Sequence, residues 1–265
     1  MLDPVHNQDE NGVGAEPRMR RISIRLLIPN LLTLLAICAG MTGIRLAFEG
    51  RFEIAVIMVL GAAFLDGIDG RAARMLKATS NFGAQMDSLA DIVNFGVAPA
   101  LVLYAYLLDQ AGSFGWIAAM LYAIACGLRL ARFNVMLDDP NRPAWQTAYF
   151  VGVPAPAGAG LVMLPIYLGF LGVEPDRSFA LGAVVFTLVV AWLLVSRLPV
   201  YSGKTVGQRI GRDAVIPLTL GAVAYVLFLT SYTWETLVAS AVAYAVFLPL
   251  SVRAYRRRAA KETLR

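Results

Sequence analysis

The sequence predicts an all-α integral membrane protein, a bundle of about eight transmembrane helices with the N- and C-termini in the cytosol. Of its 265 residues, 58% are hydrophobic, whereas a soluble domain carries about 45–50% apolar residues. The apolar residues form about eight segments near the length that a helical span needs. In this arrangement, all but three of the 23 Lys and Arg residues would face the cytosol. Hydropathy and charge therefore favour the same topology.

The two ends of the chain are expected outside the bilayer. Residues 1–23 hold no apolar run typical of a signal peptide, so they are predicted to form a disordered, juxtamembrane cytosolic tail. Residues 24–252 would form the transmembrane domain, which carries any catalytic site. Residues 253–265 would form a basic cytosolic tail, suited to anionic lipid headgroups.

The first four predicted spans lie at residues 26–48, 53–76, 82–108 and 114–135. The first follows an arginine-rich segment and ends at Gly50 and Arg51. The second runs into basic residues around Lys77, and the third ends before the polar Asp109. The fourth ends in the basic segment GLRLARFN. Each boundary is therefore marked by charge or by glycine.

The other four predicted spans lie at residues 150–172, 178–197, 214–231 and 234–252. The fifth opens with VGVPAPAGAG, whose prolines and glycines disfavour a regular helix at that point. The sixth begins after Arg177, the seventh follows Arg212, and the eighth ends at Arg253. With a cytosolic amino terminus, only Arg45, Arg51 and Arg177 lie outside, and the link between the second and third spans is cytosolic.

Four aspartates lie inside the second and third predicted spans: Asp66, Asp69, Asp87 and Asp91. Four unpaired carboxylates at mid-membrane would cost about 10 kcal/mol, so cations are expected beside them. Helical spacing places the acids of each segment on one face, and the two faces can meet. Carboxylate oxygens are ligands that Mg²⁺ prefers, together with substrate phosphates. The sequence thus predicts a divalent metal site toward the cytosolic half of the membrane.

The spacing around these acids follows the pattern DxxDGxxAR, eight residues, then GxxxDxxxD. This pattern resembles the signature of the CDP-alcohol phosphatidyltransferase family. The positions that match are Asp66, Asp69, Gly70, Ala73, Arg74, Gly83, Asp87 and Asp91. The segments PNLLTLLAICAGMTGI, DSLADIVNFGVAPA, GLRLARFNV and VGVPAPAGAG resemble the phosphatidylserine synthase branch of the family. The resemblance covers roughly residues 24–204.

The resemblance implies an activity and a set of residue roles. The expected reaction is metal-dependent transfer of phosphatidyl from CDP-diacylglycerol to L-serine, which yields phosphatidylserine and CMP. Two divalent cations, Mg²⁺ or Mn²⁺, would be held by Asp66, Asp69, Asp87 and Asp91. Asp91 would also act as the catalytic general base toward the acceptor hydroxyl. The residues expected to bind the CDP group are Asp66, Gly70, Ala73, Arg74 and Gly83.

The acceptor site is predicted at the cytosolic end of the fourth span. Serine carries a carboxylate, and Arg can bind a carboxylate with two hydrogen bonds. Arg129 and Arg132, three residues apart on one helix, would form such a clamp, with Asn134 as a further polar ligand. Spacing alone also fits ordinary positive charge at a span end, and the resemblance favours the clamp.

Two other functions remain open at this point. The same chemistry could use another acceptor, such as glycerol 3-phosphate, an inositol phosphate or choline, although a phosphorylated acceptor would need further basic residues. A cation or proton transporter could also use intramembrane aspartates, but it has no evident need for the glycines and arginine that frame them. The expected partners are CDP-diacylglycerol, L-serine and membrane lipids, with a homodimer implied by the resemblance and no nucleic acid.

Overall fold

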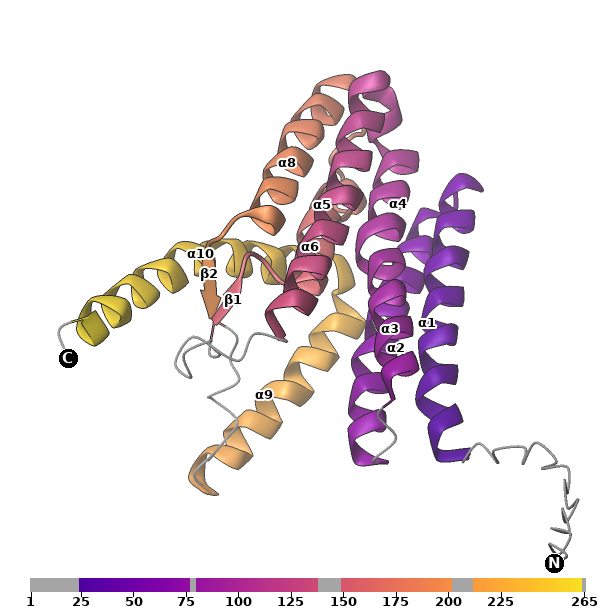
Figure 1. The fold of residues 1–265 in the computed structure, drawn as a ribbon. Helices are drawn as coiled ribbons and strands as arrows, with labels where there is room; N and C mark the ends of the chain where they lie inside the picture. Colours follow the sequence, from indigo (N-terminus) through magenta and orange to yellow (C-terminus); the bar gives the residue numbers. More distant parts are fainter. Residues whose placement is uncertain (1–23, 77–79, 138–148, 202–211, 264–265) are drawn as a thin grey trace, which may run out of the picture.

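The computed structural model describes residues 24–76, 80–137, 149–201 and 212–263. Within these ranges the chain is helical apart from one short two-stranded ladder (Figure 1). The elements of the amino-terminal half are α1 (Ile24–Phe48), α2 (Phe52–Met75), α3 (Asn81–Asp91), the π-helix η1 (Ile92–Val97), α4 (Ala98–Tyr106), the 3-10 helix η2 (Leu108–Ala111) and α5 (Ser113–Leu137). The others are β1 (Tyr149–Val151), α6 (Ala155–Val162), α7 (Leu164–Phe170), α8 (Arg177–Val195), β2 (Pro199–Tyr201), α9 (Arg212–Ser231) and α10 (Thr233–Thr263).

The bundle is built around α1, α2, α4, α5 and α8. The first two form an antiparallel hairpin joined by a turn in which Gly50 has a positive φ of 76°. The buried core lies mainly between α4, α5, α6 and α8 and includes Phe95, Leu103, Tyr122 and Leu194. The start of α1, the end of α2 and the start of α9 lie on the same side, the lower one in Figure 1.

The third predicted span is one continuous helical segment, α3–η1–α4, with a π-helical turn in its middle. Pro99 has no N–H and cannot donate to the carbonyl of Phe95, as the residue four positions later does in an α-helix. The hydroxyl of Tyr122, on α5, donates to that carbonyl instead over 2.9 Å. Single π-turns often occur at functional sites, and this one directly follows Asp91.

The fifth predicted span is divided, as its prolines and glycines suggested. Residues 149–151 form β1, which pairs antiparallel with β2 in a register that places Tyr149 opposite Tyr201. Gly152 follows with a φ of 80°, and Pro154 precedes the first residue of α6. A break at Met163 then separates α6 from α7. Neither helix is long enough to cross a bilayer alone.

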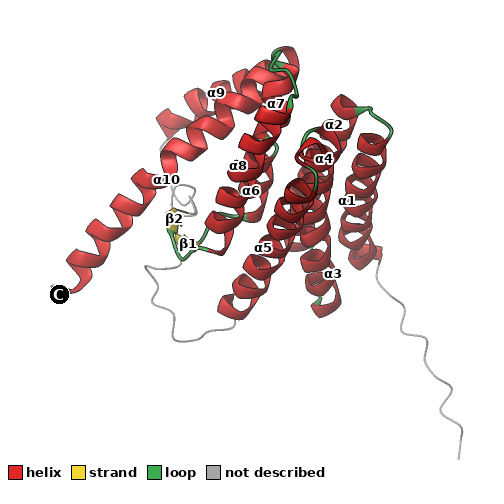
Figure 2. Cartoon of the chain, turned by 90° about the horizontal axis from the view of Figure 1, so that it is seen from above, coloured by secondary structure: helices red, strands yellow, loops and turns green. Residues whose placement is uncertain are grey.

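The last two helices diverge from the bundle. α9 has no buried residues in its most apolar window, and both views show α9 and α10 to one side of the other helices (Figure 2). The upper part of α10 contacts α6 and α7, and the hydroxyl of Ser251 donates to the carbonyl of Pro199 in β2 over 3.2 Å. α10 also continues to Thr263, through the segment predicted as a basic tail. The tail at residues 1–23 lies outside the described residues.

The predicted all-α membrane architecture is confirmed. A helix or a pair of helices occupies each of the predicted spans. Six helical segments in the described ranges are long and apolar enough to cross a membrane. The α2 helix is not among them because it carries too many charged residues, and the α6–α7 segment is interrupted. The structure therefore supports six to eight spans.

Candidate active site

Three of the four predicted aspartates converge between α2 and α3. Asp66 and Asp69 project from α2 and Asp87 from α3, and each offers an oxygen within 4.8 Å of the others. The expectation that the two acid-bearing helix faces meet is therefore confirmed. Two oxygens on opposite sides of one Mg²⁺ lie about 4.2 Å apart, so a small shift of the side chains would let all three carboxylates share one divalent cation.

Asp69 is the most deeply buried of these acids, with 2% of its surface exposed. The hydroxyl of Thr33, on α1, donates to its Oδ2 over 2.6 Å. The remaining oxygens, Asp69 Oδ1 and Asp66 Oδ1, are buried and have no hydrogen-bond partner among the described residues. A buried carboxylate oxygen without a donor is costly. The donor set and its unpaired oxygens fit a hard divalent cation.

Asp91, the last residue of α3, lies near this cluster. Its carboxyl group is within electrostatic range of Asp66 and Asp87. It is also within electrostatic range of the guanidinium of Arg129, a basic residue that the sequence predicted for the acceptor. Asp91 is therefore close both to the acid cluster and to Arg129.

A cavity of about 190 Å³ opens beside the acids. Four of the residues predicted to bind the CDP group line it, namely Gly70, Ala73, Arg74 and Gly83, and Asp66 lies next to it in the acid cluster. The described residues that line it are Pro29, Asn30, Thr33, Asp69, Gly70, Ala73, Arg74, Ser80, Gly83, Ala84 and Asp87. Sequence reasoning missed Asn30, Thr33 and Ser80, although Asn30 and Thr33 are polar residues one turn apart on the first span.

The cavity has features that favour an anion. It lies at the amino-terminal end of α3, where free backbone N–H groups and the helix dipole attract negative charge. Ser80 caps this end by accepting a hydrogen bond from the N–H of Gly83 over 3.0 Å. Arg74, at the end of α2, adds a positive charge to the opposite wall. A phosphorylated group would therefore find donors here, next to the carboxylates.

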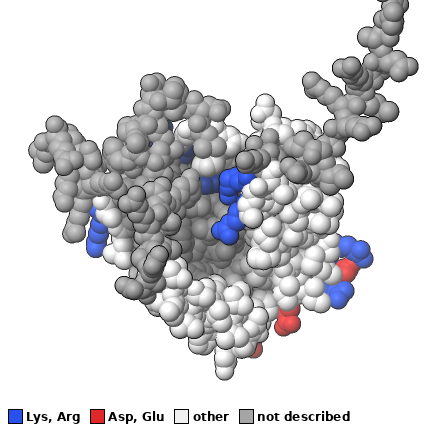
Figure 3. All heavy atoms as spheres, turned by 90° about the horizontal axis from the view of Figure 1, so that it is seen from below, with Lys and Arg blue, Asp and Glu red and all other residues white. Residues whose placement is uncertain are grey.

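This end of the molecule is hollowed. Seen from below, basic side chains lie on the wall of a hollow, whereas the acidic side chains in view lie at the outer margin (Figure 3). A positively charged entrance attracts phosphorylated ligands by raising their local concentration.

Arg129, predicted for the acceptor, is buried on α5 with 7% of its surface exposed. Its guanidinium carbon lies 5.3 Å from the centre of the Phe133 ring. It lies within electrostatic range of Asp91 and of Tyr244, a residue of α10 that sequence reasoning missed. No sequence signal marks Tyr244, since it is one tyrosine in a long apolar helix.

Arg132 and Asn134, the other predicted acceptor residues, have partners within the protein. Arg132 Nη1 donates to the carbonyl of Val195, at the end of α8, over 2.6 Å. Asn134 Nδ2 donates to Ser88 Oγ, on α3, over 3.0 Å. The structure thus does not bring Arg129 and Arg132 into one clamp. Arg132 and Asn134 instead connect α5 to α8 and α3.

A second cavity, of about 540 Å³, lies between α6, α8 and α10. Among the described residues that line it, Arg253 is the only ionisable one, and the others are apolar. It lacks the groups that chemistry on a phosphate would need. The acid cluster and its neighbouring cavity are therefore the candidate active site of the described chain.

Buried carboxylates beside a cavity that favours anions, within a helical membrane bundle, are typical of a membrane enzyme that acts on a phosphorylated substrate. The chain belongs to the CDP-alcohol phosphatidyltransferase family, whose model matches residues 26–195. This segment includes all four aspartates and the whole lining of the cavity.

The chain is also similar to individual curated proteins with named activities. The chain is 43% identical to the CDP-diacylglycerol–serine O-phosphatidyltransferase of Mycobacterium leprae over 82% of this chain and 72% of the relative. It is 40% identical to the Mycobacterium tuberculosis protein of the same name over 91% of this chain and 83% of the relative. It is also 31% identical to the archaetidylserine synthase of Methanothermobacter thermautotrophicus over 64% of this chain and 70% of that protein.

Proposed function

We propose that this chain transfers the phosphatidyl group of CDP-diacylglycerol to L-serine and releases CMP. The observation that carries the proposal is the convergence of Asp66, Asp69 and Asp87 beside a cavity lined by Gly70 and Arg74. The relatives whose names specify transfer to serine support serine as the acceptor. A relative named for archaetidylserine supports serine as the shared part of the reaction.

Asp66, Asp69, Asp87 and Asp91 would hold two divalent cations, Mg²⁺ or Mn²⁺. Bound cations would neutralise the pyrophosphate of the donor and stabilise charge on the leaving phosphate. The unpaired oxygens of Asp66 and Asp69 support this assignment. Thr33 holds Asp69 in one orientation, as residues behind metal ligands commonly do.

The CDP group of the donor would occupy the cavity at the start of α3. Gly70, Ala73 and Gly83 give room for the nucleotide, because none carries a side chain larger than a methyl group. Arg74 and the N–H groups of α3 would bind its phosphates. Asp66 would contact the nucleotide from the acid cluster.

Asp91 would take the proton of the serine hydroxyl. In the net reaction, the hydroxyl oxygen forms a bond to the phosphorus that carries diacylglycerol. The bond from that phosphorus to the oxygen of CMP breaks, and CMP leaves with the electron pair. Asp91 suits the role because it lies within electrostatic range both of the acid cluster and of Arg129.

Arg129 would bind the carboxylate of serine, since it is buried and its Nε has no hydrogen-bond partner among the described residues. Arg132 and Asn134, predicted with it, would support this acceptor site by holding α5 against α8 and α3. Replacing Arg129 or Arg132 by Ala would distinguish binding of the carboxylate from support of the helices.

We also propose that the active site faces the cytosol in a multi-pass protein of the cytoplasmic membrane. The distribution of Lys and Arg supports this orientation, and water-soluble serine and CMP could then exchange directly. Membrane lipids would surround the helices, and a homodimer is expected from the family resemblance.

The experiment is an acceptor panel with purified protein and CDP-diacylglycerol, with CMP release as the measurement. Serine should support turnover, whereas glycerol 3-phosphate, inositol phosphate and choline should support less than about one hundredth of that rate. CMP release with another acceptor in preference to serine would assign the chain to a different branch of the family. No CMP release with any acceptor would refute the phosphatidyl-transfer activity.

A further inference from the structure

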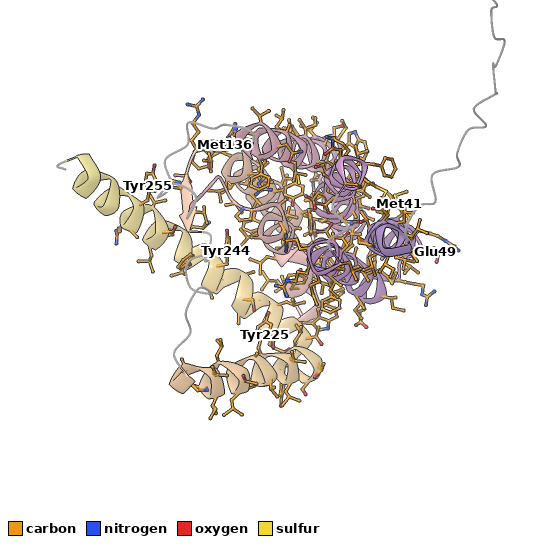
Figure 4. All side chains as sticks on the ribbon, turned by 60° about the horizontal axis from the view of Figure 1, so that its bottom comes forward. Met41, Glu49, Met136, Tyr225, Tyr244 and Tyr255 are labelled. Carbon is orange, nitrogen blue, oxygen red and sulfur yellow. The ribbon has the colours of Figure 1, made fainter. Side chains whose placement is uncertain are left out.

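Tyr244, on the last helix of the chain, lies within electrostatic range of Arg129, the residue proposed to bind serine. It lies on α10, between the junction with α9 and Tyr255 (Figure 4). Its hydroxyl is buried and has no hydrogen-bond partner among the described residues. Its ring packs against the hydrophobic core. A buried phenol without a partner is unfavourable unless a ligand or water completes it.

Arg129, on α5, also has a buried polar atom without a hydrogen-bond partner among the described residues. Its side chain is nine-tenths buried, and its Nε finds no acceptor in the described part of the chain. Phe133 covers one face of the guanidinium. Tyr244 and Asp91 both lie within electrostatic range of it. Arg129 is therefore near both an aspartate of the acid cluster and Tyr244.

Two buried, unpaired donor groups within electrostatic range of each other indicate what could bind between them. A guanidinium can only donate, and a phenol hydroxyl donates readily, so an anionic oxygen placed between them would satisfy both. A carboxylate offers two such oxygens and forms strong, charge-assisted hydrogen bonds with Arg. A neutral oxygen could also accept from both donors, but without the charge assistance that a carboxylate gives, and a cationic group would be repelled by Arg129.

We infer that Tyr244 is a specificity-determining residue, which binds the acceptor's carboxylate together with Arg129. The inference rests on the proposed function, because it takes serine as the acceptor. Serine would then lie with its hydroxyl toward Asp91 and its carboxylate between Arg129 and Tyr244. Its two ends would thus be recognised by different helices.

The position of Tyr244 in the chain supports a role in choosing the acceptor. The family description names only an alcohol, and the family match ends at Val195. The acids and the donor cavity lie within that match, whereas α10 lies beyond it. The relatives named for serine transfer align over most of this chain, 91% in one case. A residue outside the common segment is well placed to distinguish one alcohol from another.

The test compares Tyr244→Phe with Tyr225→Phe in the full-length protein. The substitution is the same, but the hydroxyl of Tyr225 lies on exposed α9, within 3.2 Å of Ser240 Oγ. Loss of a hydrogen bond to a charged group should raise the serine KM about tenfold in Tyr244→Phe. The KM for CDP-diacylglycerol should change less than about twofold, and Tyr225→Phe should match the wild type in both.

Analogues identify which end of serine is recognised. As inhibitors of the wild type, 3-hydroxypropionate keeps the hydroxyl and the carboxylate, and ethanolamine lacks the carboxylate. Tyr244→Phe should weaken inhibition by 3-hydroxypropionate and leave inhibition by ethanolamine unchanged. Calorimetric titration of serine in the presence of CDP should show the same loss of affinity.

The outcomes separate this inference from the proposed function. Serine-dependent CMP release by the wild type, with an unchanged serine KM in Tyr244→Phe, would overturn the role of Tyr244 alone. An equal rise in both KM values would also overturn it, since it would indicate a displaced helix. Absence of serine-dependent CMP release by the wild type would instead refute the proposed function.

Discussion

The hydroxyl of Thr33 donates a hydrogen bond to Oδ2 of Asp69 over 2.6 Å, so α1 orients a carboxylate of α2. Thr33→Val keeps the shape of the side chain and removes this bond. Loss of a residue that orients a metal ligand typically weakens metal binding 10- to 100-fold. We expect the Mg²⁺ concentration for half-maximal CMP release to rise at least about tenfold.

Thr42→Val is the matched control, because Thr42 lies on the same helix and its exposed hydroxyl donates only to the carbonyl of Cys38. Its Mg²⁺ dependence should equal that of the wild type. An unchanged Mg²⁺ dependence in Thr33→Val would show that Asp69 needs no support from α1.

Asp87, on α3, supplies one of the three carboxylates that lie close together. Asp87→Asn should abolish CMP release, because an amide cannot replace a charged oxygen ligand. Chelation should inactivate the wild type in the same way, and added Mg²⁺ or Mn²⁺ should restore it. Asp109→Asn, at an exposed position of η2, should retain full activity. Turnover by Asp87→Asn would remove this residue from the metal site.

Gly70 lines the cavity beside the acids, where the donor is proposed to bind, and a methyl group built on it meets no atom within 4 Å. Gly70→Ala should therefore leave the folded protein intact and intrude only on a bound ligand. A clash with the nucleotide should raise the KM for CDP-diacylglycerol about tenfold, in line with the cost of overpacking.

Gly61→Ala provides the comparison for Gly70→Ala, since Gly61 lies on the same helix, has the same open surroundings and does not line the cavity. It should have wild-type kinetics. If Gly70→Ala shares them, the CDP group is bound elsewhere.

Arg129 and Arg132 are expected to differ when each is replaced by Ala. Arg129→Ala should raise the serine KM more than the donor KM. Arg132→Ala should instead lower thermal stability, because it leaves the carbonyl of Val195 without its donor, at a cost of about 1–3 kcal/mol. A selective rise of the serine KM in Arg132→Ala would place both arginines at the acceptor.

Tyr122 supplies the donor that Pro99 cannot give to the carbonyl of Phe95. Tyr122→Phe should destabilise the protein by about 1–3 kcal/mol, because it leaves a buried carbonyl unpaired. Thermal unfolding in detergent measures this loss. Tyr232→Phe, at a position 58% exposed, should not change the melting temperature. Equal stability of the two variants would mean that water satisfies the carbonyl.

The fold was largely predictable because apolar runs and basic flanks both report on the bilayer. The details that escaped prediction are breaks within helices. The π-turn of η1 depends on a hydrogen bond from Tyr122, which is 27 residues away from Phe95 in the chain. The prolines of the α6–α7 segment indicated that it is divided. The pairing of β1 with β2 joins residues about fifty positions apart, and a hydropathy pattern cannot predict such a pairing.

The charged part of the site was also predictable, since an aspartate inside an apolar run is costly and its spacing defines a face. The uncharged part was not. Thr33 and Ser80 are common residues in helices and at helix starts, and only the fold shows that they reach Asp69 and the cavity. Arg132 was predicted beside Arg129 from spacing alone, whereas its partner at the end of α8 could be found only in three dimensions.

The described residues that line the cavity at the start of α3 all lie between Pro29 and Asp87, within the first third of the chain. Under the proposed function, the described part of the nucleotide site thus precedes α4. Mutations in later helices would then alter which alcohol is chosen without rebuilding the pocket for the activated lipid. Donor recognition and acceptor choice would be free to evolve separately in this architecture.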